Sequence, residues 1–149
     1  MPLEKAKHIV ESIKKGAIKP VYFLMGEEAY YIDAISDFIE KSILTEEEKG
    51  FNQTILYGRD VAIDEIVSTA KRFPMMAEKQ VVIVKEAQDL SRTIENLLSY
   101  VENPQPSTVL VLCYKYKSFC IGSSSFINTS NSKSIFSRTY KKPNVSNER

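Results

Sequence analysis

The strongest constraint on the fold is an alternation of two apolar patterns along residues 1 to about 117. Short continuous apolar runs, such as residues 21–25 and 81–84, alternate with segments whose apolar residues recur at helical spacing. The runs are apolar throughout rather than at every second residue, which indicates strands buried on both faces. Four such strands separated by helices predict an α/β fold: a three-layer sandwich around a short parallel sheet, a small or incomplete doubly wound domain.

The elements of this domain can be placed from periodicity and from stop signals. We expect helices near residues 3–13, 31–43, 63–72 and 91–101, and strands near residues 20–25, 51–57, 80–84 and 108–113. Gly16 would stop the first helix, and Ser91 would N-cap the fourth. Pro74 limits the third helix to about Arg72, because the residue before a proline is disfavoured in the α region.

The composition changes abruptly after Lys117. Residues 118–149 are rich in Ser, Asn, Lys and Thr, and their apolar residues keep no sustained period. We therefore predict one domain at residues 1–117 and an atypical tail at residues 118–149. This tail is predicted to be disordered, or to result from a shift of the reading frame near Lys117.

The charge and the lengths of the apolar runs exclude several classes of protein. The chain has 20 basic and 19 acidic residues and a formal net charge of +1, which gives no global attraction to nucleic acid or to an anionic membrane. Its apolar runs are too short to cross a bilayer. The charged N-terminus lacks the apolar region of a signal peptide. These features predict a cytoplasmic protein without a membrane partner.

A phosphate-binding loop would be expected at the turn after the first strand, and the sequence departs from one. A P-loop needs several glycines, then a Lys and a Ser or Thr. Only Gly26 fits, and Glu27 and Glu28 would repel a polyphosphate. The third strand is followed by Lys85 and Glu86, where an ATPase would carry two acidic residues. These five residues indicate a degenerate nucleotide site; alternatively, Gly26 makes a turn and either glutamate complements the dipole of the next helix.

Other catalytic arrangements are poorly represented. His8 is the single histidine, which excludes a multi-histidine metal site. Cys113 and Cys120 form no metal-binding or redox motif, and Cys113 closes an apolar run typical of a buried thiol. We therefore predict no catalytic residue, no metal and no cofactor.

An apolar cluster at a proline is the most informative segment. Phe73, Pro74, Met75 and Met76 follow the third helix and are flanked by charged residues. Methionine adapts to irregular grooves and suits a partner-binding surface. Burying two such side chains would contribute roughly 3–6 kcal/mol before the costs of association. The alternative is that these side chains cap the local core, and their exposure to solvent decides between the two interpretations.

Three blocks of sequence carry a resemblance to a known family. They read PVYFLMGEE at residues 20–28, RFPMMAEKQVVIVKEA at residues 72–87, and LLSYVENP at residues 97–104 followed by TVLV at residues 108–111. In order and spacing they resemble the DNA polymerase III delta subunit of clamp loaders, the Bacteroidetes-type members most closely. The resemblance covers residues 1 to about 117, and the middle block is its most specific part.

The resemblance implies a fold, partners and site residues. Delta subunits have an AAA+-like N-terminal domain with a degenerate nucleotide site. They bind the sliding clamp, the beta subunit, through a helix and an apolar turn, and favour its open form. The pair of residues that enters the clamp falls on Met75 and Met76, with Phe73 just before them, and the helix at residues 63–72 would lie along the clamp.

The resemblance also limits what this chain could do. Family members continue into further domains, including a collar that assembles the loader with its other subunits, and none is recognisable in residues 118–149. We expect clamp contact without stable loader assembly, with DNA met only through the complex. Polymerase activity belongs to the holoenzyme, since nothing in this chain could transfer a nucleotide. The alternatives are a divergent P-loop or AAA+ ATPase, and a stand-alone α/β regulatory domain.

Overall fold

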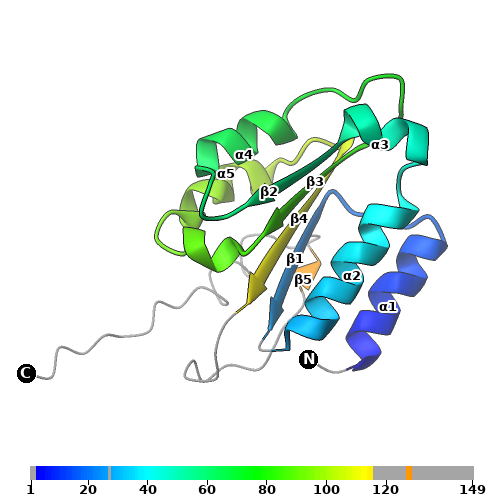
Figure 1. The fold of residues 1–149 in the computed structure, drawn as a ribbon, viewed down its shortest axis with the longest axis horizontal. Coiled ribbons are helices and arrows are strands. Elements are labelled where there is room, and N and C mark those ends of the chain that lie inside the picture. Colours follow the sequence, from blue (N-terminus) through cyan, green and yellow to red (C-terminus); the bar gives the residue numbers. More distant parts are fainter. Residues whose placement is uncertain (1–2, 27, 116–126, 129–149) are drawn as a thin grey trace, which may run out of the picture.

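A five-stranded sheet forms the centre of the molecule. The computed structural model describes residues 3–26, 28–115 and 127–128. In these residues the strand order is β2-β3-β4-β1-β5, and the first four strands are parallel (Figure 1). The strands are β1 (Val21–Gly26), β2 (Gln53–Tyr57), β3 (Gln80–Lys85), β4 (Thr108–Lys115) and β5 (Ile127–Asn128). The two residues of β5 pair antiparallel with β1.

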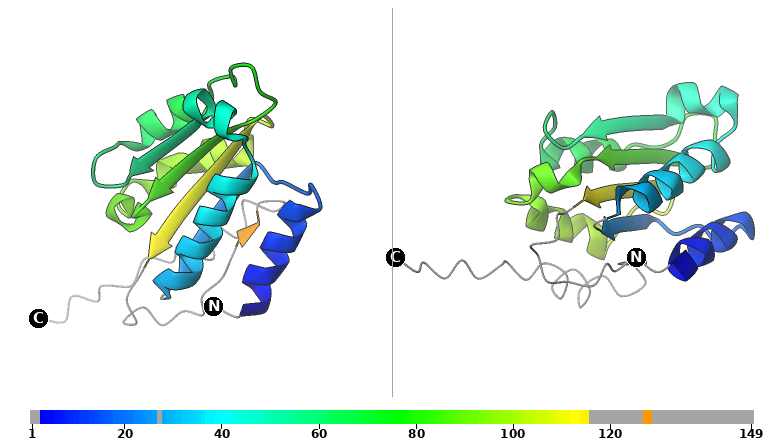
Figure 2. Two further views of the ribbon diagram at one scale, coloured as in Figure 1. Left: turned by 45° about the vertical axis from the view of Figure 1, so that its right-hand side comes forward. Right: turned by 60° about the horizontal axis from the view of Figure 1, so that its bottom comes forward.

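Helices cover both faces of the sheet (Figure 2). One face carries α1 (Leu3–Lys14) and α2 (Ala29–Ser42); the other carries α4 (Ile63–Ala70), two 3-10 helices, η1 (Ala87–Leu90) and η2 (Ile94–Leu97), and α5 (Leu98–Glu102). The short α3 (Glu46–Asn52) precedes β2 directly. The predicted α/β fold with three layers and four short parallel strands is thus confirmed.

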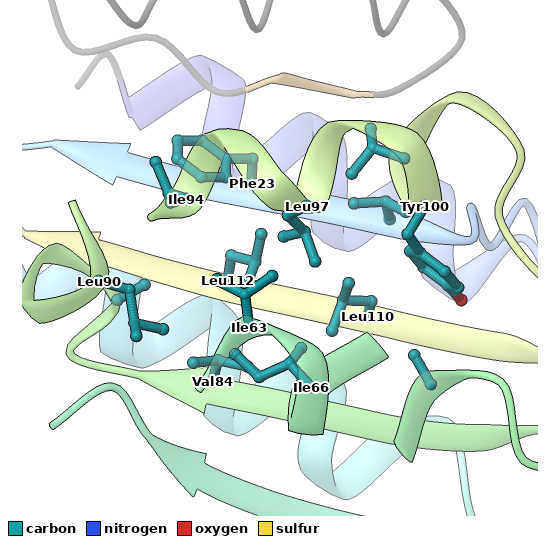
Figure 3. Close-up of a cluster of buried hydrophobic side chains, with 14 of the residues drawn as sticks. Phe23, Ile63, Ile66, Val84, Leu90, Ile94, Leu97, Tyr100, Leu110 and Leu112 are labelled. Carbon is teal, nitrogen blue, oxygen red and sulfur yellow. The ribbon is translucent and has the colours of Figure 1, made fainter. Parts of the chain in front are cut away.

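Two buried clusters explain why the strands are apolar throughout. In β3, Val82 and Val84 belong to the cluster beneath α4 and η2, whereas Val81 and Ile83 belong to the cluster beneath α1 and α2. Figure 3 shows the cluster beneath α4 and η2, in which side chains from the sheet and from the helices that cover it point toward one another. A central strand therefore has no face on which a polar residue could reach water.

The prediction for residues 51–57 was partly wrong. Residues 51 and 52 end α3, and the strand begins at Gln53. Thr45 accepts a hydrogen bond from the amide of Glu48, and the Glu48 side chain accepts one from the amide of Thr45. This capping box is a sequence-level sign of a helix start, and the prediction of a strand from Phe51 did not take it into account.

The prediction of one continuous fourth helix was also wrong. Ser91 lies at the C-cap of η1 instead of starting a helix. The segment runs through η1 and η2 before one short α-helix, α5. Ile94, Leu97 and Tyr100 are buried, and their spacing of three residues matches the 3-10 repeat.

The parallel sheet has two distinct edges. Its carboxyl edge brings together the last residues of the strands, with Gly26 paired to Lys115 and Tyr57 paired to Lys85. Its amino edge brings together the strand starts, with Gln80 paired to Thr108. None of the described helices is long and apolar enough to cross a membrane. Apart from β5, residues 118–149 lie outside the described residues, and their predicted disorder or frame shift stays a prediction.

Candidate functional site

The apolar cluster projects from the amino edge of the sheet. It lies in the turn between the end of α4 and the start of β3. The exposed fractions are 81% for Phe73, 61% for Met75 and 101% for Met76, while Pro74 is half-buried. This exposure contradicts the alternative in which the cluster caps the core. It leaves three large apolar side chains available to a partner. We call residues 73–76 the apolar turn.

Side chains from the neighbouring strands hold the end of α4, where the apolar turn begins. The last carbonyls of a helix have no partner within the helix. Here Nε2 of the Gln80 side chain lies 3.3, 3.2 and 2.5 Å from the carbonyl oxygens of Thr69, Ala70 and Arg72, which share its two hydrogens. The Thr108 hydroxyl donates to the Ala70 carbonyl at 2.6 Å. The start of the turn is therefore fixed to β3 and β4.

The middle of the apolar turn is held from α3. The side-chain amide of Asn52 donates to the Met75 carbonyl at 2.8 Å and accepts from the Met75 amide at 2.6 Å. It also donates to the Glu48 carbonyl at 3.1 Å within α3. Asn52 is buried, although its neighbour Phe51 is exposed, as are the side chains of the turn.

The residues predicted for a degenerate nucleotide site gather at the opposite, carboxyl edge. Gly26 ends β1 and is buried, and Lys85 ends β3. Glu28 is the N-cap residue of α2 without a side-chain capping hydrogen bond. Glu86 follows β3 with a positive φ of 54°. Glu27 lies outside the described residues.

Lys115, at the end of β4, is a second lysine at this edge, beside Lys85 at the end of β3. Its ammonium lies 3.0 Å from a carboxylate oxygen of Asp33 and 3.3 Å from one of Glu86. Burial disfavours the charged ammonium, but the two carboxylates outweigh it and raise the pKa of Lys115. The hydrogen bond from Gln88 lowers the pKa of Glu86; burial opposes this shift, and Lys115 adds to it. The ammonium of Lys115 is thus already paired with two carboxylates.

Other reactive groups form no catalytic arrangement in the described ranges. His8 is exposed on α1. Cys113 is buried, and burial raises the pKa of its thiol to about 11, which makes it a poor nucleophile. Within residues 3–26, 28–115 and 127–128, no three His, Cys, Asp or Glu residues are grouped as a metal site would require.

Comparison with known proteins identifies the family. A family model described as "DNA polymerase III, delta subunit" matches residues 22–140. The chain belongs to this delta subunit family. DNA polymerase III subunit delta of Bacillus subtilis (strain 168) is 31% identical over 116 residues, which cover 72% of this chain and 33% of that relative.

A solved structure supports the delta-subunit fold. The Bacillus subtilis DNA clamp loader delta protein (YqeN) superposes with a TM-score of 0.66 at 29% identity, over 76% of this chain and 37% of that one. The chain thus spans about a third of the length of these two relatives. The delta-subunit family resemblance read from the sequence is confirmed, whereas the Bacteroidetes type stays a prediction.

In this delta-family chain the two predicted sets of site residues lie at opposite edges of one sheet. Sequence reasoning missed three residues beside them: Phe51, Asn52 and Lys115. The capping box at Thr45 could have placed Phe51 and Asn52 in a helix. No local pattern could have revealed the contacts from Asn52 to Met75, because 23 residues separate the two.

Proposed function

We propose that this chain binds the sliding clamp of the bacterial replication machinery through the apolar turn and favours the open form of the ring. The observation that carries the proposal is the exposure of Phe73, Met75 and Met76 on a turn whose backbone is held by buried side chains. Burial in an apolar pocket contributes about 1.5–3 kcal/mol for each large side chain. Three such side chains would anchor the contact, and further surface would have to meet the costs of association.

Clamp opening would follow if the chain bound the open ring more tightly than the closed ring. A ligand shifts an equilibrium only to the extent that it binds one state more tightly. The proposal therefore requires the apolar turn and the exposed side of α4 to fit the opened ring better than the closed one. The other loader subunits would join through the rest of the full-length protein, and DNA would be met only through that complex, in the cytoplasm.

The proposed function includes no nucleotide hydrolysis. The sequence lacks the Lys and the Ser or Thr of a P-loop after Gly26. The nearby ammonium of Lys115 is bound to Asp33 and Glu86. A polyphosphate at this edge would have to displace two carboxylates, and it would meet the charge of Glu28 as well.

The double variant Met75→Ala, Met76→Ala tests clamp binding. We expect its affinity for the sliding clamp, measured by titration calorimetry, to fall by at least about hundredfold, because two buried side chains are lost. Tyr30→Ala is the matched control, since Tyr30 is an exposed aromatic residue near the opposite edge of the sheet. An unchanged affinity of the double variant, with wild-type thermal unfolding, would refute the assignment.

The opening step needs a separate measurement. The affinity of this chain is compared for the closed ring and for a clamp whose ring interface has been broken by mutation. Tighter binding to the broken ring is expected, because closing strain no longer opposes the complex. Equal affinities would leave the chain a clamp-binding protein that does not promote opening.

A further inference from the structure

We propose that Asn52 is a positioning residue of clamp binding: its side-chain amide fixes the backbone of Met75 and thereby the direction in which Met75 and Met76 leave the surface. This inference rests on the proposed function. Asn52 itself is buried and would make no contact with the clamp.

The geometry requires an amide side chain of this length. Asn52 donates to the carbonyl of Met75 and accepts from the amide of the same residue, at 2.8 and 2.6 Å. These two bonds copy the way in which two backbone segments pair in a sheet. A carboxylate in this place could accept but not donate, and an aliphatic side chain could do neither. Both polar groups of the Met75 backbone are satisfied by this one side chain.

The backbone of the rest of the turn makes few hydrogen bonds. Within the described part of the chain, the bonds from Asn52 are the hydrogen bonds recorded for the backbone of residues 73–79. The flanks are held separately: the side chains of Gln80 and Gln105 both donate to the Arg72 carbonyl, and the backbone N–H of Gln80 donates to the Ser107 carbonyl. Removing the Asn52 amide would therefore free the tip of the turn while its ends stay in place.

Met76 depends most on this restraint. Its φ of 55° lies in the left-handed region, which is unfavourable for a residue with a Cβ. Its side chain is fully exposed, so packing of that side chain cannot hold the backbone in this conformation. The adjacent Met75, fixed on both its amide and its carbonyl, supplies the constraint. Asn52 therefore acts on Met76 through the backbone.

Fixing the turn before binding lowers the cost of ordering it in the complex. Without the Asn52 amide, the turn would have to be ordered by the clamp itself. We expect Asn52→Ala to weaken clamp binding about tenfold, which corresponds to about 1.4 kcal/mol. Asn52→Leu keeps the volume of the side chain without its hydrogen bonds, and it should weaken binding to a similar extent.

Three measurements on the full chain test this role. The first is the affinity of each Asn52 variant for the sliding clamp. The second is hydrogen exchange of the Met75 amide, which should accelerate in Asn52→Ala while amides of β3 and β4 keep their protection. The third repeats Asn52→Ala in a Met76→Ala background, where its effect on affinity should shrink below about threefold because one of the two positioned side chains is gone.

Two control variants separate positioning from loss of stability. Ile39→Val weakens the core on the face covered by α2 and should leave clamp affinity unchanged. Asn96→Ala removes an exposed asparagine from η2 and should change neither affinity nor the exchange of the Met75 amide. A weakening of binding by Ile39→Val equal to that of Asn52→Ala would mean that lost stability alone explains the result.

The failure of this inference can be told from the failure of the proposed function. Asn52→Ala with wild-type affinity, or with the Met75 amide still protected, overturns the positioning role, while lost binding in the Met75→Ala, Met76→Ala variant keeps the proposed function standing. Equal effects of Asn52→Ala with and without Met76→Ala also overturn it. Wild-type affinity in the double methionine variant removes both proposals together.

Discussion

At the scale of single residues, buried polar side chains determine where the backbone of this chain turns. Among the described residues, the buried polar side chains are those of Ser36, Asn52, Thr69, Gln80 and Thr108. All but Ser36 belong to the amino edge, around the apolar turn. Gln80 and Thr108 bind the end of α4, and Asn52 binds the turn itself. A buried polar group left without a partner costs about 1–3 kcal/mol, so these residues specify one arrangement of the edge.

The opposite edge should stabilise the fold in a pH-dependent way through Glu86. Its pKa in the folded chain lies below the ordinary 4.5. The ionised Glu86 carboxylate therefore stabilises the folded chain fully above about pH 4.5. This stabilisation is lost as the pH falls through the lower pKa of Glu86 in the folded state. Because Glu86 is partly exposed, we expect Glu86→Gln to cost about 0.5–1 kcal/mol at pH 7. Urea unfolding should show this difference shrinking below about pH 4; a gap that persists at acid pH would contradict the assignment.

At the scale of elements, the sequence predicts the strands from their continuous apolar runs, but it does not predict the short and irregular helices. Each of the four predicted strands exists, because a run such as residues 81–84 is too short for a buried helix and is made of β-branched residues. The helix α3 was missed because Phe51 was taken as the start of a strand, although it is exposed. The segment after β3 was predicted as one helix because its apolar spacing fits both an α-helix and a 3-10 helix.

Two glycines should respond in opposite directions to substitution by alanine. A Cβ on Gly58 would lie 2.3 Å from the carbonyl oxygen of Glu86, whereas a Cβ on Gly50 meets nothing within 4 Å. Gly58→Ala should therefore cost about 1–3 kcal/mol, since backbone must shift. Gly50→Ala should add about 0.5–1 kcal/mol, because alanine favours the helix α3. Chemical denaturation gives the free energy of unfolding of both variants. An unchanged free energy in Gly58→Ala would show that the end of β2 can move away from Glu86.

At the scale of the whole molecule, the parallel sheet separates the two sites. The four parallel strands, β1 to β4, all start at the edge with the apolar turn and all end at the edge with Lys115. The proposed partner contact and any phosphate contact would therefore use opposite ends of the same strands. The sequence marked the apolar turn and the departures from a P-loop by residue type, and the assignment of Met75 and Met76 to clamp contact came from the family resemblance and stays a prediction. The sequence could not predict the exposure of Met75 and Met76, which depends on contacts across the fold.

The carboxyl edge predicts how the melting temperature of the whole chain responds to nucleotide. A site with a Kd of about 10 μM would stabilise the fold by about 2.7 kcal/mol at 1 mM ligand, and would raise the Tm by about 5–10 °C. We expect Mg-ATP at 1 mM to shift the Tm by less than about 1 °C, because Lys115 is bound to Asp33 and Glu86 and the P-loop Lys is absent.

Thermal unfolding with Mg-ATP, with magnesium alone and with sodium triphosphate measures this response. Magnesium alone corrects for ionic effects, and triphosphate corrects for nonspecific binding of anions to surface lysines. A shift of several degrees with Mg-ATP and none with triphosphate would revive the divergent ATPase. The Lys115→Met variant would then show whether Lys115 or Lys85 supplies the cation, since loss of the shift assigns it to Lys115. An absent shift in the wild-type chain would agree with a carboxyl edge at which Lys115 stays paired with Asp33 and Glu86.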